Sequence, residues 1–227
     1  MFKRALALPF SILILAGSGC AGSGTQLSFW PFEQKTNTSG VLSPSEQVKA
    51  LRDMAKKASS RTDQEKREIS VNLATLLQKE GDSLIRAEII HALGKFPTAE
   101  SLAAVRGALN DPEADVRVSA CQALGNLGGP DAVVSLTEVL RGDVDADVRL
   151  AAARALGQTR EQAAIAALGT ALEDSDPSMQ YLAVTSLKNV TGKNLGDDVR
   201  VWQQYVKGET PQPAEVSVAD RMRQMFR

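Results

Sequence analysis

The sequence is poor in the residues from which catalytic and metal sites are usually built. Among its 227 residues are one histidine, His91, and two cysteines, Cys20 and Cys121. A single histidine excludes a metal site made of several histidines and disfavours a Ser-His-Asp triad. Two cysteines do not make the clustered set that a disulfide framework requires. The sequence therefore predicts a protein that is not an enzyme and that has no metal or other cofactor.

Aromatic residues and charge of one sign are also scarce. Phenylalanine, tryptophan and tyrosine make up 4% of the chain, whereas alanine and leucine are abundant, which favours packed helices over a sheet core. The formal net charge is -1. A nucleic-acid-binding protein normally has a strongly basic stripe, so nucleic acid is not expected as a partner.

A short phrase recurs four times in the middle of the chain. Measured from Arg86 to Arg117, Arg149 and Gln180, the steps are 31, 32 and 31 residues. A fixed period in this range is typical of stacked-repeat proteins, whose units are too small to bury their apolar faces alone. The copies are Ile85-Arg86…Ala92-Leu93-Gly94, Val116-Arg117…Ala123-Leu124-Gly125, Val148-Arg149…Ala155-Leu156-Gly157 and Met179-Gln180…Ser186-Leu187-Lys188.

Each copy is predicted to be the second helix of a helical hairpin. Capping boxes are expected at Ser43 to Glu46, Thr62 to Glu65 and Thr159 to Gln162, and Asp-Pro pairs at 111–112 and 176–177 predict further helix starts. The fold class predicted is therefore all-α, an α-solenoid of about four hairpins with capping helices at both ends. The expected hairpins are 62–79 with 83–94, 98–109 with 113–127, 130–140 with 145–157, and 160–173 with 177–190.

The second and third copies, 115–125 and 147–157, resemble HEAT repeats, in particular the subtype first noted in phycobilin lyases. The resemblance covers about 62–190, although the last copy has Gln180 in place of the arginine and Lys188 in place of the glycine. It implies a protein-interaction scaffold or adaptor. Two alternatives stay open: a lyase-like accessory factor for a cofactor-bearing protein, and a purely structural envelope protein. No residue marks a tetrapyrrole site or a small-molecule substrate site.

The N-terminus has the anatomy of a signal peptide over 1–19. A basic pair precedes an apolar run of about 12 residues, which is too short to span a bilayer, and then small residues lead to Cys20. This arrangement resembles the lipobox of bacterial lipoproteins, although Gly17 stands where that family prefers leucine. The resemblance implies lipidation of Cys20 and attachment to the periplasmic face of a bacterial membrane, with Ala21 compatible with the outer one. Ordinary signal cleavage is the alternative.

Four further segments complete the predicted organisation. A flexible tether covers 20–42, and its aromatic cluster at 29–32 is suited either to docking on the folded domain or to a lipid–water interface. An N-terminal capping helix covers 43–61, and 191–208 forms a C-terminal cap in which Trp202 and Tyr205 cover the last repeat. A proline-containing linker and a basic amphipathic tail make up 209–227. The tail could bind lipid, a partner or its own domain.

Three arginines that recur with the repeat invite a functional interpretation, but nearby aspartates favour a structural one. Arginine forks and carboxylates with a common period suggest a ladder that ties neighbouring turns together. The members of this predicted structural ladder are Arg86, Arg117, Arg149, Asp111, Asp115, Asp143 and Asp147.

The partner-binding surface is predicted on the outward positions of the second helices. Aligned copies give three rows, which combine polar and modestly apolar side chains as reversible interfaces do. A merely solvated face is the alternative. The first row is Ala87, Val118, Leu150 and Tyr181; the second is His91, Gln122, Arg154 and Thr185; the third is Lys95, Asn126, Gln158 and Asn189.

Overall fold

The computed structural model describes residues 43–210, which form ten α-helices and two short 3-10 helices with no β-strand. The predicted all-α fold is confirmed. The predicted signal peptide, Cys20, the tether and nearly all of the tail lie outside the described residues. The helices are α1 Pro44–Lys56, α2 Asp63–Lys79, α3 Ser83–Leu93, α4 Ala99–Gly107, α5 Ala114–Leu127, α6 Pro130–Gly142, α7 Ala146–Thr159, α8 Ala164–Ala171, α9 Pro177–Thr191 and α10 Val199–Val206, with 3-10 helices at Ala58–Ser60 and Ala108–Asn110.

The first two helices begin where their capping boxes predict. The Ser43 hydroxyl accepts a hydrogen bond from the Glu46 N–H, and the Glu46 carboxylate accepts one from the Ser43 N–H at 2.8 Å. Thr62 and Glu65 repeat this arrangement ahead of α2. Each box satisfies backbone donors that the first turn of a helix leaves without partners.

Two predicted helix caps are wrong, because each expected capping side chain caps a turn that precedes the helix. The Asp111 carboxylate accepts from the Glu113 N–H, and the Thr159 hydroxyl accepts from the Glu161 N–H. Thr159 is the last residue of α7, where its hydroxyl donates to the Leu156 carbonyl, and α8 begins only at Ala164. Glu113, not Asp111, is the N-cap of α5, which begins at Ala114, one residue after the predicted start at 113.

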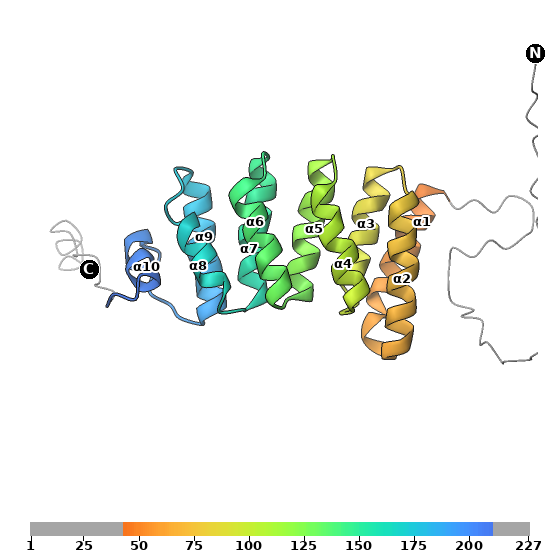
Figure 1. Ribbon diagram of the computed structural model, residues 1–227, viewed down its shortest axis with the longest axis horizontal. Coiled ribbons are helices and arrows are strands. Elements are labelled where there is room, and N and C mark those ends of the chain that lie inside the picture. Colours follow the sequence, from red (N-terminus) through yellow and green to blue (C-terminus); the bar gives the residue numbers. More distant parts are fainter. Residues whose placement is uncertain (1–42, 211–227) are drawn as a thin grey trace, which may run out of the picture. The chain divides into compact units, whose positions relative to one another are not determined.

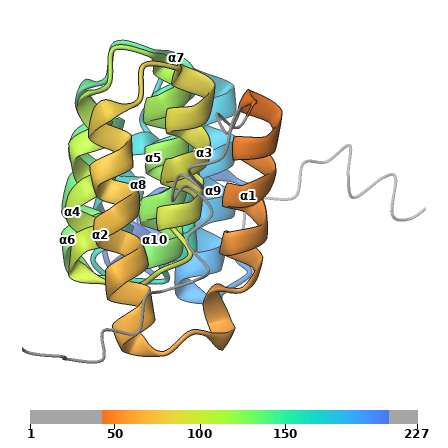
Figure 2. The ribbon, with the colours of Figure 1, turned by 90° about the vertical axis from the view of Figure 1, so that its right-hand side faces the viewer.

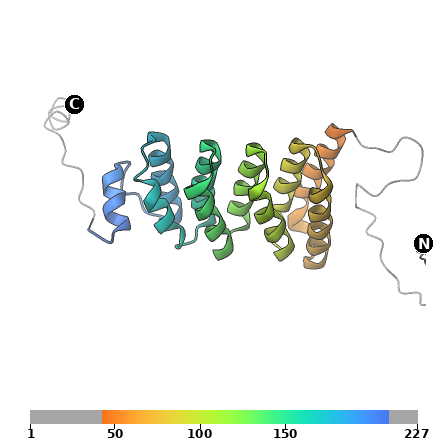
Figure 3. The ribbon, with the colours of Figure 1, turned by 45° about the horizontal axis from the view of Figure 1, so that its top comes forward.

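The helices form two layers, and each layer follows the order of the chain. Helices α1, α3, α5, α7 and α9 pack side by side in one layer, called the B layer below, and α2, α4, α6, α8 and α10 form the other, the A layer. Figure 1 shows the pairs in a row, Figure 2 looks along the row, and Figure 3 shows the same succession from a tilted direction. The stack thus begins with a lone B-layer helix and ends with a lone A-layer helix.

Neighbouring B-layer helices touch through the glycine of the repeated phrase. A Cβ built on Gly94 would lie 2.9 Å from the Ala123 Cα, and one built on Gly157 would lie 2.8 Å from the Ser186 Cα. Gly125 makes the same contact with Ala155. The Ala-Leu-Gly phrase is therefore a contact between repeats, in which glycine in one copy accommodates the alanine or serine of the next.

The leucine of the phrase forms the core between the layers. Leu93, Leu124, Leu156 and Leu187 are all fully buried. At the C-terminal end Trp202 of α10 is also fully buried, and its indole N–H donates to the Gly196 carbonyl at 3.0 Å. Trp202 is therefore part of the core, as predicted. Within residues 43–210, no helix combines the length and the apolar character needed to cross a bilayer.

Candidate functional site

The three predicted rows lie across the B layer, at successive turns of the same helix face. Each row takes one residue from each of α3, α5, α7 and α9, except that Lys95 follows the end of α3. The first row is partly exposed and ends at Tyr181, which is 67% exposed. The second and third rows are exposed, apart from the half-buried Thr185. No member is buried, so the B layer presents a continuous accessible surface across four helices.

Two of the repeated arginines bind the aspartate of the following turn through both arms of the guanidinium fork. Arg86 donates to Asp111 at 2.9 Å from both Nε and Nη2, and Arg117 donates to Asp143 at 2.8 and 3.0 Å. The side chains of Arg117 and Asp143 are only 12% and 9% exposed. Such bidentate, partly buried pairs fix both distance and orientation between neighbouring repeats.

The pairing holds both aspartates in their charged form. The Arg117 hydrogen bonds lower the pKa of the Asp143 carboxyl more than its burial raises it. For Asp111, burial raises the pKa, but the hydrogen bonds from Arg86 and from the Glu113 N–H together outweigh it, and the pKa is lowered. The two guanidinium groups in turn have raised pKa values.

The ladder of arginines and aspartates has fewer members in the structure than the sequence predicts. The Arg149 Nη1 donates to the carbonyls of Asp143 and Val144, but no carboxylate among the described residues forms an ion pair with it. Asp115 and Asp147 likewise form no ion pair within 43–210, because the arginines reach forward to the next turn and away from their own helix starts. Gln180 replaces the arginine in the last copy but still donates to the Asp174 carbonyl.

The two residues with most potential for chemistry differ in their access to solvent. His91 is exposed on the B layer, whereas Cys121 is fully buried, and burial raises its thiol pKa to about 12. At that pKa the thiol is protonated at neutral pH and is a poor nucleophile. The described segment contains no group of three histidine, cysteine, aspartate or glutamate residues arranged to hold a metal ion.

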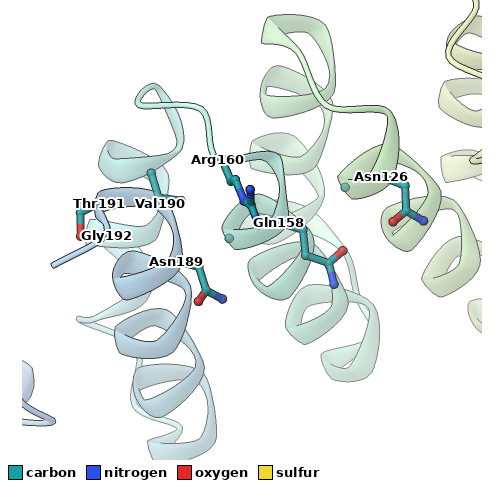
Figure 4. Close-up of a pocket in the computed structure, with 9 residues that line it drawn as sticks. Asn126, Gln158, Arg160, Asn189, Val190, Thr191 and Gly192 are labelled. Carbon is teal, nitrogen blue, oxygen red and sulfur yellow. The ribbon is translucent and has the colours of Figure 1, made fainter. Parts of the chain in front are cut away.

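A polar depression of about 780 Å³ lies at the C-terminal ends of α5, α7 and α9. Figure 4 shows three third-row carboxamides on these successive helices, with Arg160 near the end of α7. The backbone of Arg160 adopts the left-handed conformation, with φ of 56°. Among residues 43–210 it is the one non-glycine residue that does so. Nothing in the sequence singles out Arg160, because it falls outside the repeated phrase. The lining residues are Gly125, Asn126, Gly157, Gln158, Arg160, Asn189, Val190, Thr191 and Gly192.

A second depression continues the B layer toward the N-terminal end. It has a volume of about 380 Å³ and lies between α1 and α3. Its carboxylate, Glu88, is paired with Arg52, so its remaining charged groups are cationic. The lining residues are Arg52, Ala55, Lys56, Glu88, His91 and Lys95.

Comparison with known families gives a match over most of the solenoid. The profile of the HEAT repeats matches residues 70–156 and 133–200, which together span more than half of the 227 residues. No curated protein matched the chain.

Two solved structures resemble the chain at low sequence identity. One is the complex of CpcE and CpcF of phycocyanin lyase from Nostoc sp. PCC7120, with a TM-score of 0.55 and 19% identity, over 85% of this chain and 80% of that chain. The other is an engineered protein, with a TM-score of 0.45 and 19% identity, over 75% of this chain and 94% of that chain. The first similarity establishes a shared fold, and the second is too weak to support a comparison.

Proposed function

Since the chain belongs to the HEAT-repeat family, we propose that it is a non-catalytic scaffold that binds another protein through the exposed face of its B layer. The observation that carries this proposal is the continuity of the first and second rows across α3, α5, α7 and α9. Elongated, rigid surfaces of this kind suit large partners, and stacking provides them without a deep cavity. Neither nucleic acid nor a small-molecule substrate is part of the proposal.

The side chains of the first row have the chemistry of a reversible interface. Val118 and Leu150 are half-buried apolar groups, and Tyr181 adds an exposed aromatic ring at the end of the row. Tyrosine is enriched among the residues that dominate binding energy, because its ring is large and loses little conformational freedom. The second row supplies polar neighbours, which interfaces place around such apolar groups.

Changing Leu150 and Tyr181 together to glutamate is expected to abolish capture of the partner. Two charges buried in an apolar contact have no compensating group, so binding should weaken by at least roughly 100-fold. The measurement is crosslinking in intact cells, followed by purification of the full chain and identification of what accompanies it.

The matched control changes Val71 and Val134, which are 49% and 55% exposed on α2 and α6, to glutamate. It adds the same charge to the A layer. Equal capture by wild type and by both variants would contradict a binding role for the B-layer rows and favour the structural alternative.

We also propose that the protein is exported and lipid-anchored at the bacterial cell envelope through Cys20, preferentially at the outer membrane. The support is the signal-like sequence over 1–19 and the position of Cys20 directly after it. The residues that follow, up to 42, would place the solenoid away from the membrane surface.

Replacing Cys20 with alanine is expected to remove the lipid and release the protein from the membrane fraction. The readouts are fractionation and the intact mass of the chain, and Cys121→Ala serves as the cysteine control. If the Cys20→Ala chain retains the wild-type modification mass and stays with membranes, the lipoprotein proposal fails.

The second candidate is an accessory factor for a cofactor-bearing protein. The likeness to the complex of CpcE and CpcF of phycocyanin lyase favours it, although that likeness is one of fold. A pigment that copurifies with the full chain, seen as visible absorbance, would support this candidate over the scaffold.

A further inference from the structure

The third row carries three carboxamides whose hydrogen-bonding groups are not used within residues 43–210. Asn126, Gln158 and Asn189 are exposed, and none of their side chains has a hydrogen-bond partner in that range. The Gln158 side chain extends over Gly125, where a Cβ would lie 2.7 Å from its Oε1. A carboxamide both donates and accepts hydrogen bonds, so it can bind the N–H and the C=O of a peptide group at once.

The general packing distance of helices, which sets the spacing expected of the row, suits one backbone conformation. Packed helices lie about 8–10 Å apart. A polyproline II helix has three residues per turn and rises about 3.1 Å per residue, so the same edge returns every ~9 Å. A β-strand returns every ~7 Å and would fall out of step within two repeats. Polyproline II also has no internal hydrogen bonds, so its peptide groups are available to the carboxamides.

The charges around the row favour an acidic ligand. The polar depression contains Arg160 and no carboxylate. In the second depression Glu88 is paired with Arg52 and Lys56 with Asp53, which leaves Lys95 as a cation without a carboxylate partner among the described residues. The carbonyl ends of the helices oppose an anion here, and these cations offset that effect. The chain's own tail, with three arginines in 221–227, has the wrong charge for this surface.

We propose that the third row, with Arg160, is a groove that binds an extended, acidic segment of the partner in the polyproline II conformation. This inference rests on the proposed function and names the chemistry of its ligand. The carboxamides contact the main chain once every three residues, and the cations at Lys95 and Arg160 contact its carboxylates.

The test uses the full chain and a fluorescent peptide of four Glu-Pro-Pro triplets, with binding followed by anisotropy. Micromolar binding is expected. Each lost hydrogen bond should weaken it by roughly threefold to tenfold, so Asn126→Ala, Gln158→Ala and Asn189→Ala together should weaken it at least ~30-fold. The control variant removes two exposed carboxamides of the A layer, Asn72 and Gln78, and should bind like wild type.

Two control peptides separate conformation from charge. Four Lys-Pro-Pro triplets keep the conformation with the opposite charge, and four Glu-Gly-Ser triplets keep the charge in a flexible chain. Both should bind at least ~10-fold more weakly. Equal binding of either peptide, an unaffected triple variant, or no binding of Glu-Pro-Pro would overturn the inference. Loss of binding to anionic vesicles in the triple variant, without peptide binding, would assign the groove to a membrane instead.

Arg160→Gly tests the charge without loss of fold. Glycine adopts the left-handed conformation at φ 56° readily, so the melting temperature should stay or rise while peptide affinity falls by roughly tenfold. Failure of this inference is distinguishable from failure of the scaffold proposal. Capture that depends on Leu150 and Tyr181 but not on the carboxamides would leave the scaffold intact and overturn the groove.

Discussion

Replacing Gly157 with alanine is expected to lower the melting temperature by roughly 5–10 °C. The added Cβ would lie 2.7 Å from the Ser186 Cβ and 2.8 Å from its Cα, so α7 and α9 would have to move apart. The clash involves backbone, and a rotamer change cannot relieve it. Overpacking of this kind costs about 2–3 kcal/mol, which corresponds to this shift in a domain of about this size. Thermal unfolding followed by circular dichroism measures it.

Gly107→Ala is the matched control. Gly107 also lies in a helix, α4, but nothing lies within 4 Å of a Cβ built there. Alanine should therefore stabilise this helix by about 0.5–1 kcal/mol through its higher helix propensity. If both variants shift the melting temperature in the same direction, the glycine of the phrase is not a packing requirement.

Replacing Arg117 with alanine is expected to destabilise the fold by about 2–4 kcal/mol. The change leaves the Asp143 carboxylate, 9% exposed, without its bidentate partner, and it removes donors to the carbonyls of Asp111 and Pro112. The largely buried carboxylate keeps the hydrogen bond from the Asp145 N–H but loses its ion pair, and this accounts for most of the loss. The free energy of unfolding from urea titration at neutral pH measures the effect.

Arg149→Ala is the internal control for this prediction. Arg149 makes the carbonyl contacts of its counterpart without an ion pair, so its loss should cost only about 1 kcal/mol. Equal losses from the two variants would show that the carbonyl contacts, and not the ion pair with Asp143, stabilise the turns.

The stability of the fold should depend on pH because the pKa of Asp143 is shifted by folding. Its pKa is lowered in the folded state from the ordinary value of 3.8, so the folded chain binds fewer protons than the unfolded chain near that pH. The stabilisation is therefore present above the unfolded pKa and is lost as the pH falls through the folded pKa. The difference in stability between wild type and Arg117→Ala should shrink below about pH 4. A difference that grows in acid would contradict the assignment.

Much of the fold follows from local sequence. The capping boxes at Ser43 and Thr62, and the Asp-Pro pair at 176–177, mark helix starts within a residue, because caps act on backbone groups only two or three positions away. The caps predicted at Asp111 and Thr159 are wrong. Each side chain does accept a backbone N–H two residues on, but that N–H belongs to a turn ahead of the helix, which begins only at Ala114 or Ala164.

Part of the candidate site could likewise be predicted from the sequence, and part could not. The positions of the rows follow from the repeat, since residues at the same position in stacked copies must be neighbours. Arg160 and the depression it lines could not be predicted, because Arg160 lies outside the repeat and acquires its place from the left-handed turn after α7.

The sequence by itself determined that this protein is an all-helical stack of repeats. The fixed period requires units that bury their apolar faces against one another, and the composition rich in alanine and leucine favours helices. Only the tertiary structure decided which groups meet across the repeats. It joined Arg117 to Asp143, 26 residues away, and not to an aspartate of its own helix, and it set Gly157 against Ser186. Those contacts depend on how far one hairpin is displaced from the next. Close packing between helices sets that displacement, and the local propensities of the residues do not encode it.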